Sequence, residues 1–120
     1  IYVAPGGFHM EIIRQENDLR VRLSNSPPEN FCKPSVDPMF RSVIELFGNK
    51  VLGVILTGMG NDGIGGGELL IKKSGRLIAQ DEATSVVWGM PGAVAKAGLC
   101  TAVLPLDEIG PWVRKAMMGF

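Results

Sequence analysis

The stretch VLGVILTGMGNDGIGGGELL, residues 51–70, joins an apolar run to a glycine-dense segment. Val51–Leu56 is continuous and rich in β-branched residues, which is typical of a strand buried on both faces of a parallel sheet. Thr57–Gly67 is predicted to be a loop, and Glu68–Ser74 a short helix that ends at Gly75. This strand–loop–helix unit indicates an α/β fold, in which functional side chains lie beyond the carboxyl ends of the strands.

The sequence around this unit continues the alternation of helices and strands. Upstream, Asp37-Pro38 is typical of an N-cap followed by proline in the first helical turn, and the predicted helix extends to Gly48. Downstream, further strands are predicted at Leu77–Gln80 and Thr101–Leu104, and further helices at Pro91–Ala97 and from Leu106 to Met117. Such alternation predicts a parallel sheet with helices on both faces, a Rossmann-like three-layer arrangement.

The first 24 residues follow a different pattern. Ile1–Ala4 is predicted to be a short strand, and His9–Arg14 and Leu19–Leu23 to be the two strands of an antiparallel hairpin. Leu19, Val21 and Leu23 alternate with polar residues, which is the pattern of a half-buried strand. We therefore assign residues 1–120 to one domain, with a hairpin at 1–24 and βα units at 37–120.

Composition excludes several function classes. Twelve basic residues balance twelve acidic ones, so no net charge favours a nucleic acid or an anionic membrane as partner. No apolar run approaches the roughly 20 residues that span a bilayer. The chain has two cysteines outside any CxxC pair and one histidine. We therefore expect no zinc site built from this chain alone. The strand-like start without a methionine predicts a fragment of a larger protein.

Two interpretations of the glycine-dense loop compete at this point. Gly58-x-Gly60-x-x-Gly63 fits the pattern of a loop that binds a phosphate or a dinucleotide at a helix N-terminus. Asp62, however, lies inside that loop, where its charge would repel a phosphate. In the other interpretation Asp62 is the functional group, a carboxylate that holds and stabilises a histidine side chain. A purely structural role, as a cap of the following helix, stays open on the local pattern alone.

Six segments together resemble the C-terminal domain of CheB-type chemotaxis protein-glutamate methylesterases. They are Tyr2–Met10, Arg14 with the strand after it, Pro34–Phe40, Gly53–Gly63, Ile78–Glu82 and Val87–Pro91. The resemblance covers nearly the whole chain, and the TGMGNDG stretch with the later GMP is specific in combination.

The resemblance implies an activity and partners. Members of this family hydrolyse glutamyl methyl esters on the cytoplasmic tails of chemoreceptors, and many deamidate glutamines there, without a metal or other cofactor. A serine is the nucleophile, a histidine the general base, and an aspartate orients the histidine. The implied partners are the methylated receptor tails and an N-terminal receiver domain that restrains the site. The implied location is the cytoplasm.

Carried over by position, the family's aspartate falls on Asp62. Met59, Gly60 and Met90 are expected to line the oxyanion region or the crevice. The family's serine and histidine precede the segment that begins at Ile1, and His9 aligns with a histidine of the hairpin instead. The chain alone is therefore expected to be inactive. The alternatives are a non-catalytic module that binds receptors and a phosphate- or nucleotide-binding domain.

Overall fold

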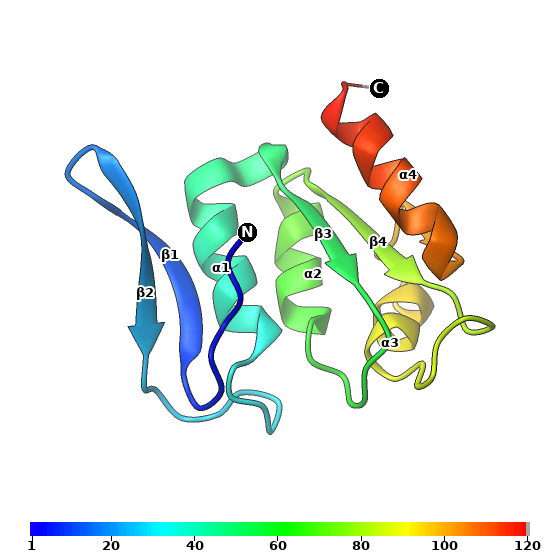
Figure 1. Ribbon diagram of the computed structural model, residues 1–120, viewed down its shortest axis with the longest axis horizontal. Coiled ribbons are helices and arrows are strands. Elements are labelled where there is room, and N and C mark those ends of the chain that lie inside the picture. The colour runs from blue at the N-terminus through cyan, green and yellow to red at the C-terminus, as the bar shows by residue number, and fades with distance from the viewer. Residues whose placement is uncertain (120) are drawn as a thin grey trace.

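The computed structural model describes residues 1–119 as two small sheets and four α-helices (Figure 1). The hairpin consists of β1 (His9–Gln15) and β2 (Asp18–Ser24), which pair antiparallel with Gln15 opposite Asp18. A two-residue turn therefore joins the strands, and it begins at Glu16, whose φ is 58°. The predicted hairpin is confirmed.

The second sheet contains three parallel strands in the order β3-β4-β5. These are β3 (Leu52–Ile55), β4 (Arg76–Gln80) and β5 (Ala102–Leu104). Val54 pairs with Ile78, and Ile78 pairs with Ala102. Because the strands are parallel, their carboxyl ends lie at one edge, and the loops that leave β3 and β4 meet there.

Helices cover both faces of the parallel sheet, as predicted. They are α1 (Val36–Phe47), which a 3₁₀ turn at Gly48–Lys50 follows, α2 (Ile64–Lys72), α3 (Met90–Lys96) and α4 (Leu106–Met117). α1 packs against α2 and β1, and α2 and α3 pack against β4. Trp112 of α4 contacts Arg76 on the opposite face of the sheet from Leu77, whose side chain lies near α2.

The core lies between α1, α2, α3 and the sheet. Its buried apolar side chains are Phe40, Ile44, Ile55, Leu70, Leu77, Ala79 and Val94. α1 and α2 run side by side in the same direction (Figure 1), so both helix N-termini point to the carboxyl ends of the strands. No helix within residues 1–119 has the length and apolar character needed to cross a membrane.

Two predictions for the N-terminal part are wrong. Ile1–Ala4 forms no strand; Ile1, Tyr2 and Val3 are largely exposed and have no strand partner among the described residues. The alternating apolar side of β2 is not half-buried either: Leu19, Val21 and Leu23 are all classed as exposed. The period-2 pattern is present, but no described element packs over that face of the hairpin.

Two helix starts also differ from prediction. α1 begins at Val36 with Ser35 as the N-cap, so Asp37 lies inside the first turn and not at the cap. α2 begins at Ile64 and not at Glu68. Gly66 lies inside this helix at a place where only glycine fits, because an added Cβ would lie 2.7 Å from Cβ of Phe40.

Candidate functional site

Asp62 lies in the loop between β3 and α2, and its side chain is buried, with 3% of the residue exposed. Its carboxylate accepts three hydrogen bonds. Oδ1 accepts from the Ser35 hydroxyl at 2.7 Å and from the Asn30 amide at 2.9 Å, and Oδ2 accepts from the Val36 backbone N–H at 2.7 Å. These three donors fix the orientation of the carboxylate.

These contacts mean that Asp62 caps α1, a helix from another part of the chain. Val36 is the first residue of α1, and its N–H has no partner inside the helix. The positive end of the helix dipole favours the negative charge of the carboxylate there. The structural alternative, in which Asp62 caps the helix that follows it, is wrong, because the N-cap of α2 is Gly63 with a φ of 108°.

Asp37 provides the reciprocal contact. It belongs to the first turn of α1, is 6% exposed, and its Oδ1 accepts from the Gly66 backbone N–H in the first turn of α2 at 2.8 Å. The Asn30 amide nitrogen also donates to Asp37 Oδ2, at 2.8 Å. Each helix N-terminus is therefore capped by a carboxylate from the segment of the other, and Asn30 joins the two carboxylates.

This arrangement disfavours phosphate binding at the glycine-dense loop. A phosphate needs free backbone N–H groups at a helix N-terminus and a positive local potential. The N–H of Gly66 is already bonded to Asp37, and Asp62 places a second carboxylate beside it. An added anion would face two buried negative charges.

A serine and a histidine lie near Asp62, but they do not form a catalytic triad. The Ser35 hydroxyl donates directly to the carboxylate, whereas a nucleophile would donate to an imidazole. His9 is 1% exposed; its Nδ1 accepts from the Ser35 backbone N–H at 3.1 Å and its Nε2 lies 2.9 Å from the Pro27 carbonyl oxygen. Both ring nitrogens are therefore engaged in hydrogen bonds beside the hairpin.

The first residues after β3 are fixed to the loop after β4. Gly58 donates to the Val87 carbonyl at 3.0 Å, and its own carbonyl accepts from the N–H of Gly89 at 3.1 Å and of Met90 at 2.8 Å. The Thr57 hydroxyl donates to the same Val87 carbonyl at 2.9 Å. Glycine is required at position 89, where a Cβ would lie 2.9 Å from the Gly58 carbonyl oxygen.

Met59 and Gly60 form the exposed tip of the loop between β3 and α2. The Met59 side chain is 82% exposed, and Gly60 has a φ of 94°. Neither backbone N–H donates to any group within residues 1–119. Met90 begins α3, and its sulfur would lie 3.0 Å from a Cβ placed on Gly58. The three residues predicted to line the crevice thus lie in or beside the loop between β3 and α2, at the same edge of the sheet as Asp62.

The ionisable groups next to the site include one exposed ion pair. Both terminal guanidinium nitrogens of Arg41 donate to the carboxylate of Glu29, at 2.9 and 2.7 Å. The hydrogen bond to Arg41 lowers the pKa of Glu29 below its ordinary value. This pair attaches the turn that carries Asn30 to α1.

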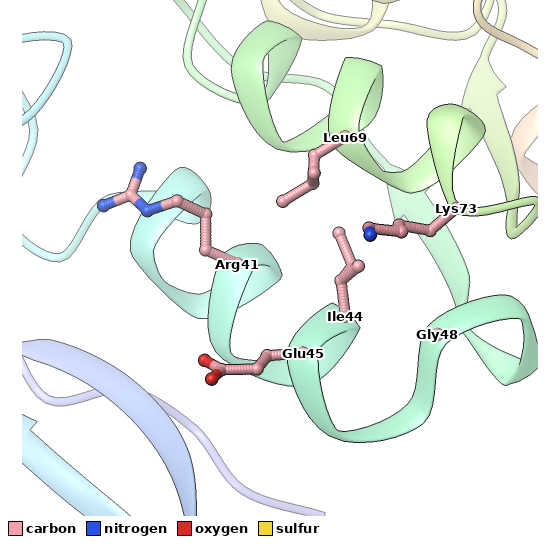
Figure 2. A pocket seen from close by; sticks show the side chains of 6 residues that line it. All are labelled: Arg41, Ile44, Glu45, Gly48, Leu69 and Lys73. Carbon is pink, nitrogen blue, oxygen red and sulfur yellow. The ribbon is translucent and has the colours of Figure 1, made fainter.

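A depression of about 470 Å³ lies elsewhere, between α1 and α2 (Figure 2). Its lining residues are Arg41, Ile44, Glu45, Gly48, Leu69 and Lys73. Ile44 and Leu69 face each other across it, whereas the charged ends of Arg41 and Glu45 point away (Figure 2). It contains none of the predicted site residues. Among residues 1–119, no three His, Cys, Asp or Glu side chains are grouped to hold a metal ion.

The sequence predicted Asp62 and the loop around Met59, but not the residues that hold the carboxylate. Neither Asn30 nor Ser35 has a predicted functional role. Asp37 was predicted as a cap of its own helix. An available signal was the pair Ser35 and Asp37 at the start of a helix, since both residue types bond backbone N–H groups at helix N-termini.

Comparison with known proteins supports the resemblance. The CheB methylesterase family model matches residues 1–113. The protein-glutamate methylesterase/protein-glutamine glutaminase 1 of Paramagnetospirillum magneticum is 57% identical over 115 residues, which are 96% of this chain and 30% of that protein. The corresponding protein of Azospirillum brasilense is 59% identical over 115 residues, 95% of this chain and 29% of that protein. The chain thus spans about 30% of the length of these relatives.

A solved structure has the same fold. The crystal structure of the Thermotoga maritima CheB methylesterase catalytic domain superimposes with a TM-score of 0.83 and 38% sequence identity. The superposition covers 87% of this chain and 55% of that chain.

Proposed function

Because this chain belongs to the CheB methylesterase family, we propose that it supplies the aspartate of a Ser-His-Asp triad in a protein-glutamate methylesterase. The serine and the histidine would come from the part of the protein that precedes residue 1. The supporting observation is the Asp62 carboxylate, which is buried and held by three donors at the carboxyl end of β3.

The role of Asp62 follows from its remaining acceptor capacity. A carboxylate offers about four acceptor positions. Oδ1 accepts two hydrogen bonds and Oδ2 accepts one, so Oδ2 keeps one position. An imidazole N–H that donates there is fixed in the tautomer that leaves its other nitrogen free to take the proton of a serine hydroxyl.

The hydrolysis then proceeds in two stages. The serine oxygen attacks the ester carbonyl of a glutamyl methyl ester while the imidazole takes the serine proton. The imidazolium returns that proton to the departing methanol, and water releases the glutamate from the acyl-enzyme. Asp62 stabilises the imidazolium in both stages. The N–H groups of Met59 and Gly60 are proposed to face the carbonyl oxygen as it becomes negative, with Met90 at the crevice wall.

The proposed substrates are the methylated cytoplasmic tails of chemoreceptors, and a receiver domain of the same protein is the proposed regulatory partner. The proposed location of the protein is therefore the cytoplasm. Residues 1–120 alone are proposed to lack esterase activity, because an orienting carboxylate does nothing without the nucleophile and the base.

The test is Asp62→Asn in the full-length protein, with methanol release from methylated receptor as the measurement. An amide in place of the carboxylate favours the wrong imidazole tautomer, so kcat is expected to fall by about 10⁴-fold. A fall of less than about tenfold in a folded protein would overturn the proposal.

Asp81→Asn is the matched control. Asp81 follows β4 at the same edge of the sheet, and its Oδ1 accepts from the N–H and the hydroxyl of Thr84 at 3.0 and 2.6 Å. The same substitution there removes a negative charge near the site without touching Asp62. Its kcat is expected to stay within about threefold of the unaltered protein.

A further inference from the structure

We propose that Asn30 is a positioning residue that selects which oxygen of Asp62 receives the imidazole. The inference rests on the proposed function of Asp62. It concerns one amide group that contacts neither the substrate nor the reacting atoms.

The first observation is the geometry of the Asn30 amide. Its nitrogen donates one hydrogen bond to Asp62 Oδ1 at 2.9 Å and one to Asp37 Oδ2 at 2.8 Å. Both N–H groups of the amide are thereby used, and each points at a buried carboxylate. The amide nitrogen thus bridges two buried carboxylates, and a donor between them offsets the repulsion of their negative charges.

The second observation is that the backbone fixes the amide in place. Asn30 and Phe31 have φ values of 53° and 64°, and the flanking residues Glu29 and Cys32 exchange two backbone hydrogen bonds, at 3.1 and 2.9 Å. Positive φ at both central residues is the geometry of a type I′ turn, in which asparagine is favoured. The ion pair of Glu29 with Arg41 attaches this turn to α1.

The consequence lies in how the acceptors of Asp62 are divided. With the Ser35 hydroxyl, the Asn30 amide occupies both acceptor positions of Oδ1. Oδ2 bonds only the Val36 N–H and is the oxygen left for the imidazole. Without Asn30, Oδ1 regains an open acceptor position and the carboxylate keeps only two of its three hydrogen bonds. The imidazole is then held in more than one geometry, and misplacement of a catalytic group by about 1 Å lowers the rate by about 10²-fold.

Asn30→Gly in the full-length protein tests this role. Glycine adopts positive φ without strain, so the turn is kept and only the amide is removed. We expect kcat for methanol release to fall about 10- to 100-fold with KM nearly unchanged, each protein being assayed well below its own Tm. Phe31→Gly is the control: Phe31 is the other central residue of the turn, its φ is also positive and its side chain is fully exposed, so the same substitution keeps the Asn30 amide and should leave kcat within about threefold.

A double-substitution cycle separates positioning from a structural role. If Asn30 acts through Asp62, adding Asn30→Gly to Asp62→Asn lowers the residual kcat by less than about twofold. If the two losses multiply, Asn30 acts independently of Asp62 and the inference fails. An unchanged kcat in the Asn30→Gly protein also overturns the inference about Asn30. The proposed function of Asp62 is tested separately, by the kcat of the Asp62→Asn protein. Full activity of Asp62→Asn would overturn the proposed function itself.

Discussion

The junction of α1 and α2 buries polar side chains, whereas the β1–β2 hairpin exposes apolar ones. At the junction, two carboxylates are buried and every bond they make is to a named donor in this chain. On the hairpin, three apolar side chains of β2 are exposed and only β1 contacts the helices substantially. Both carboxylates of the junction thus have hydrogen-bond donors within residues 1–119, whereas no described element covers the outer face of the hairpin.

Truncating one leucine in each region is expected to give the largest contrast. Leu70 of α2 is fully buried in the core, so Leu70→Ala should lower the free energy of unfolding by about 2–5 kcal/mol. Leu19 of β2 is 47% exposed, and Leu19→Ala should cost less than about 1 kcal/mol. Urea unfolding of the chain measures both. Equal losses would mean that the outer face of β2 is packed in solution.

The same contrast shows how far the sequence predicts this fold. The continuous apolar run at Val51–Leu56 and the amphipathic pattern from Leu106 were enough to place β3 and α4. The pattern at Leu19–Leu23 predicted a half-buried strand; the strand is confirmed, but the predicted burial is wrong. Burial depends on what packs over the strand, and period-2 alternation shows only which side is apolar.

The site illustrates a second limit. The assignment of Asp62 rests on the family resemblance, because its own loop leaves a role as a helix cap open. Its partners Asn30 and Ser35 are 32 and 27 residues away in sequence, and no local pattern links them to it. The start of α2 was missed because Gly65–Gly67 disfavour a helix by propensity; close packing against Phe40 outweighs that preference.

Glycine substitutions are expected to give a smaller contrast. A Cβ on Gly66 would lie 2.7 Å from Cβ of Phe40 and 3.0 Å from Oδ1 of Asp37, so Gly66→Ala should cost about 1–3 kcal/mol. Gly6, before the hairpin, has no atom within 4 Å of the added Cβ, and Gly6→Ala should change stability by less than about 1 kcal/mol. Unfolding midpoints in urea give both values. A Gly66→Ala chain as stable as the unaltered one would contradict the close packing of the two helices.

The ion pair between Glu29 and Arg41 should give the smallest effect. Arg41 lowers the pKa of Glu29 in the folded chain, so the stabilisation is present above the ordinary pKa of a glutamate and is lost as the pH falls through the lowered value. Both side chains are substantially exposed, which limits the contribution to less than about 1 kcal/mol.

Unfolding of Glu29→Gln beside the unaltered chain, from neutral to acidic pH, measures this contribution. The two chains should differ at neutral pH and converge in acid. A difference that grows as the pH falls would contradict the assigned cause.

The most direct test of the account is a crystal structure of the full-length protein at a resolution that defines the side chains around Asp62. We predict a histidine ring nitrogen from the preceding part of the protein within about 2.6–3.2 Å of Oδ2, with Asn30 and Ser35 still bonded to Oδ1. A structure in which the carboxylate bonds only Asn30, Ser35 and Val36, and no imidazole reaches it, would contradict the account.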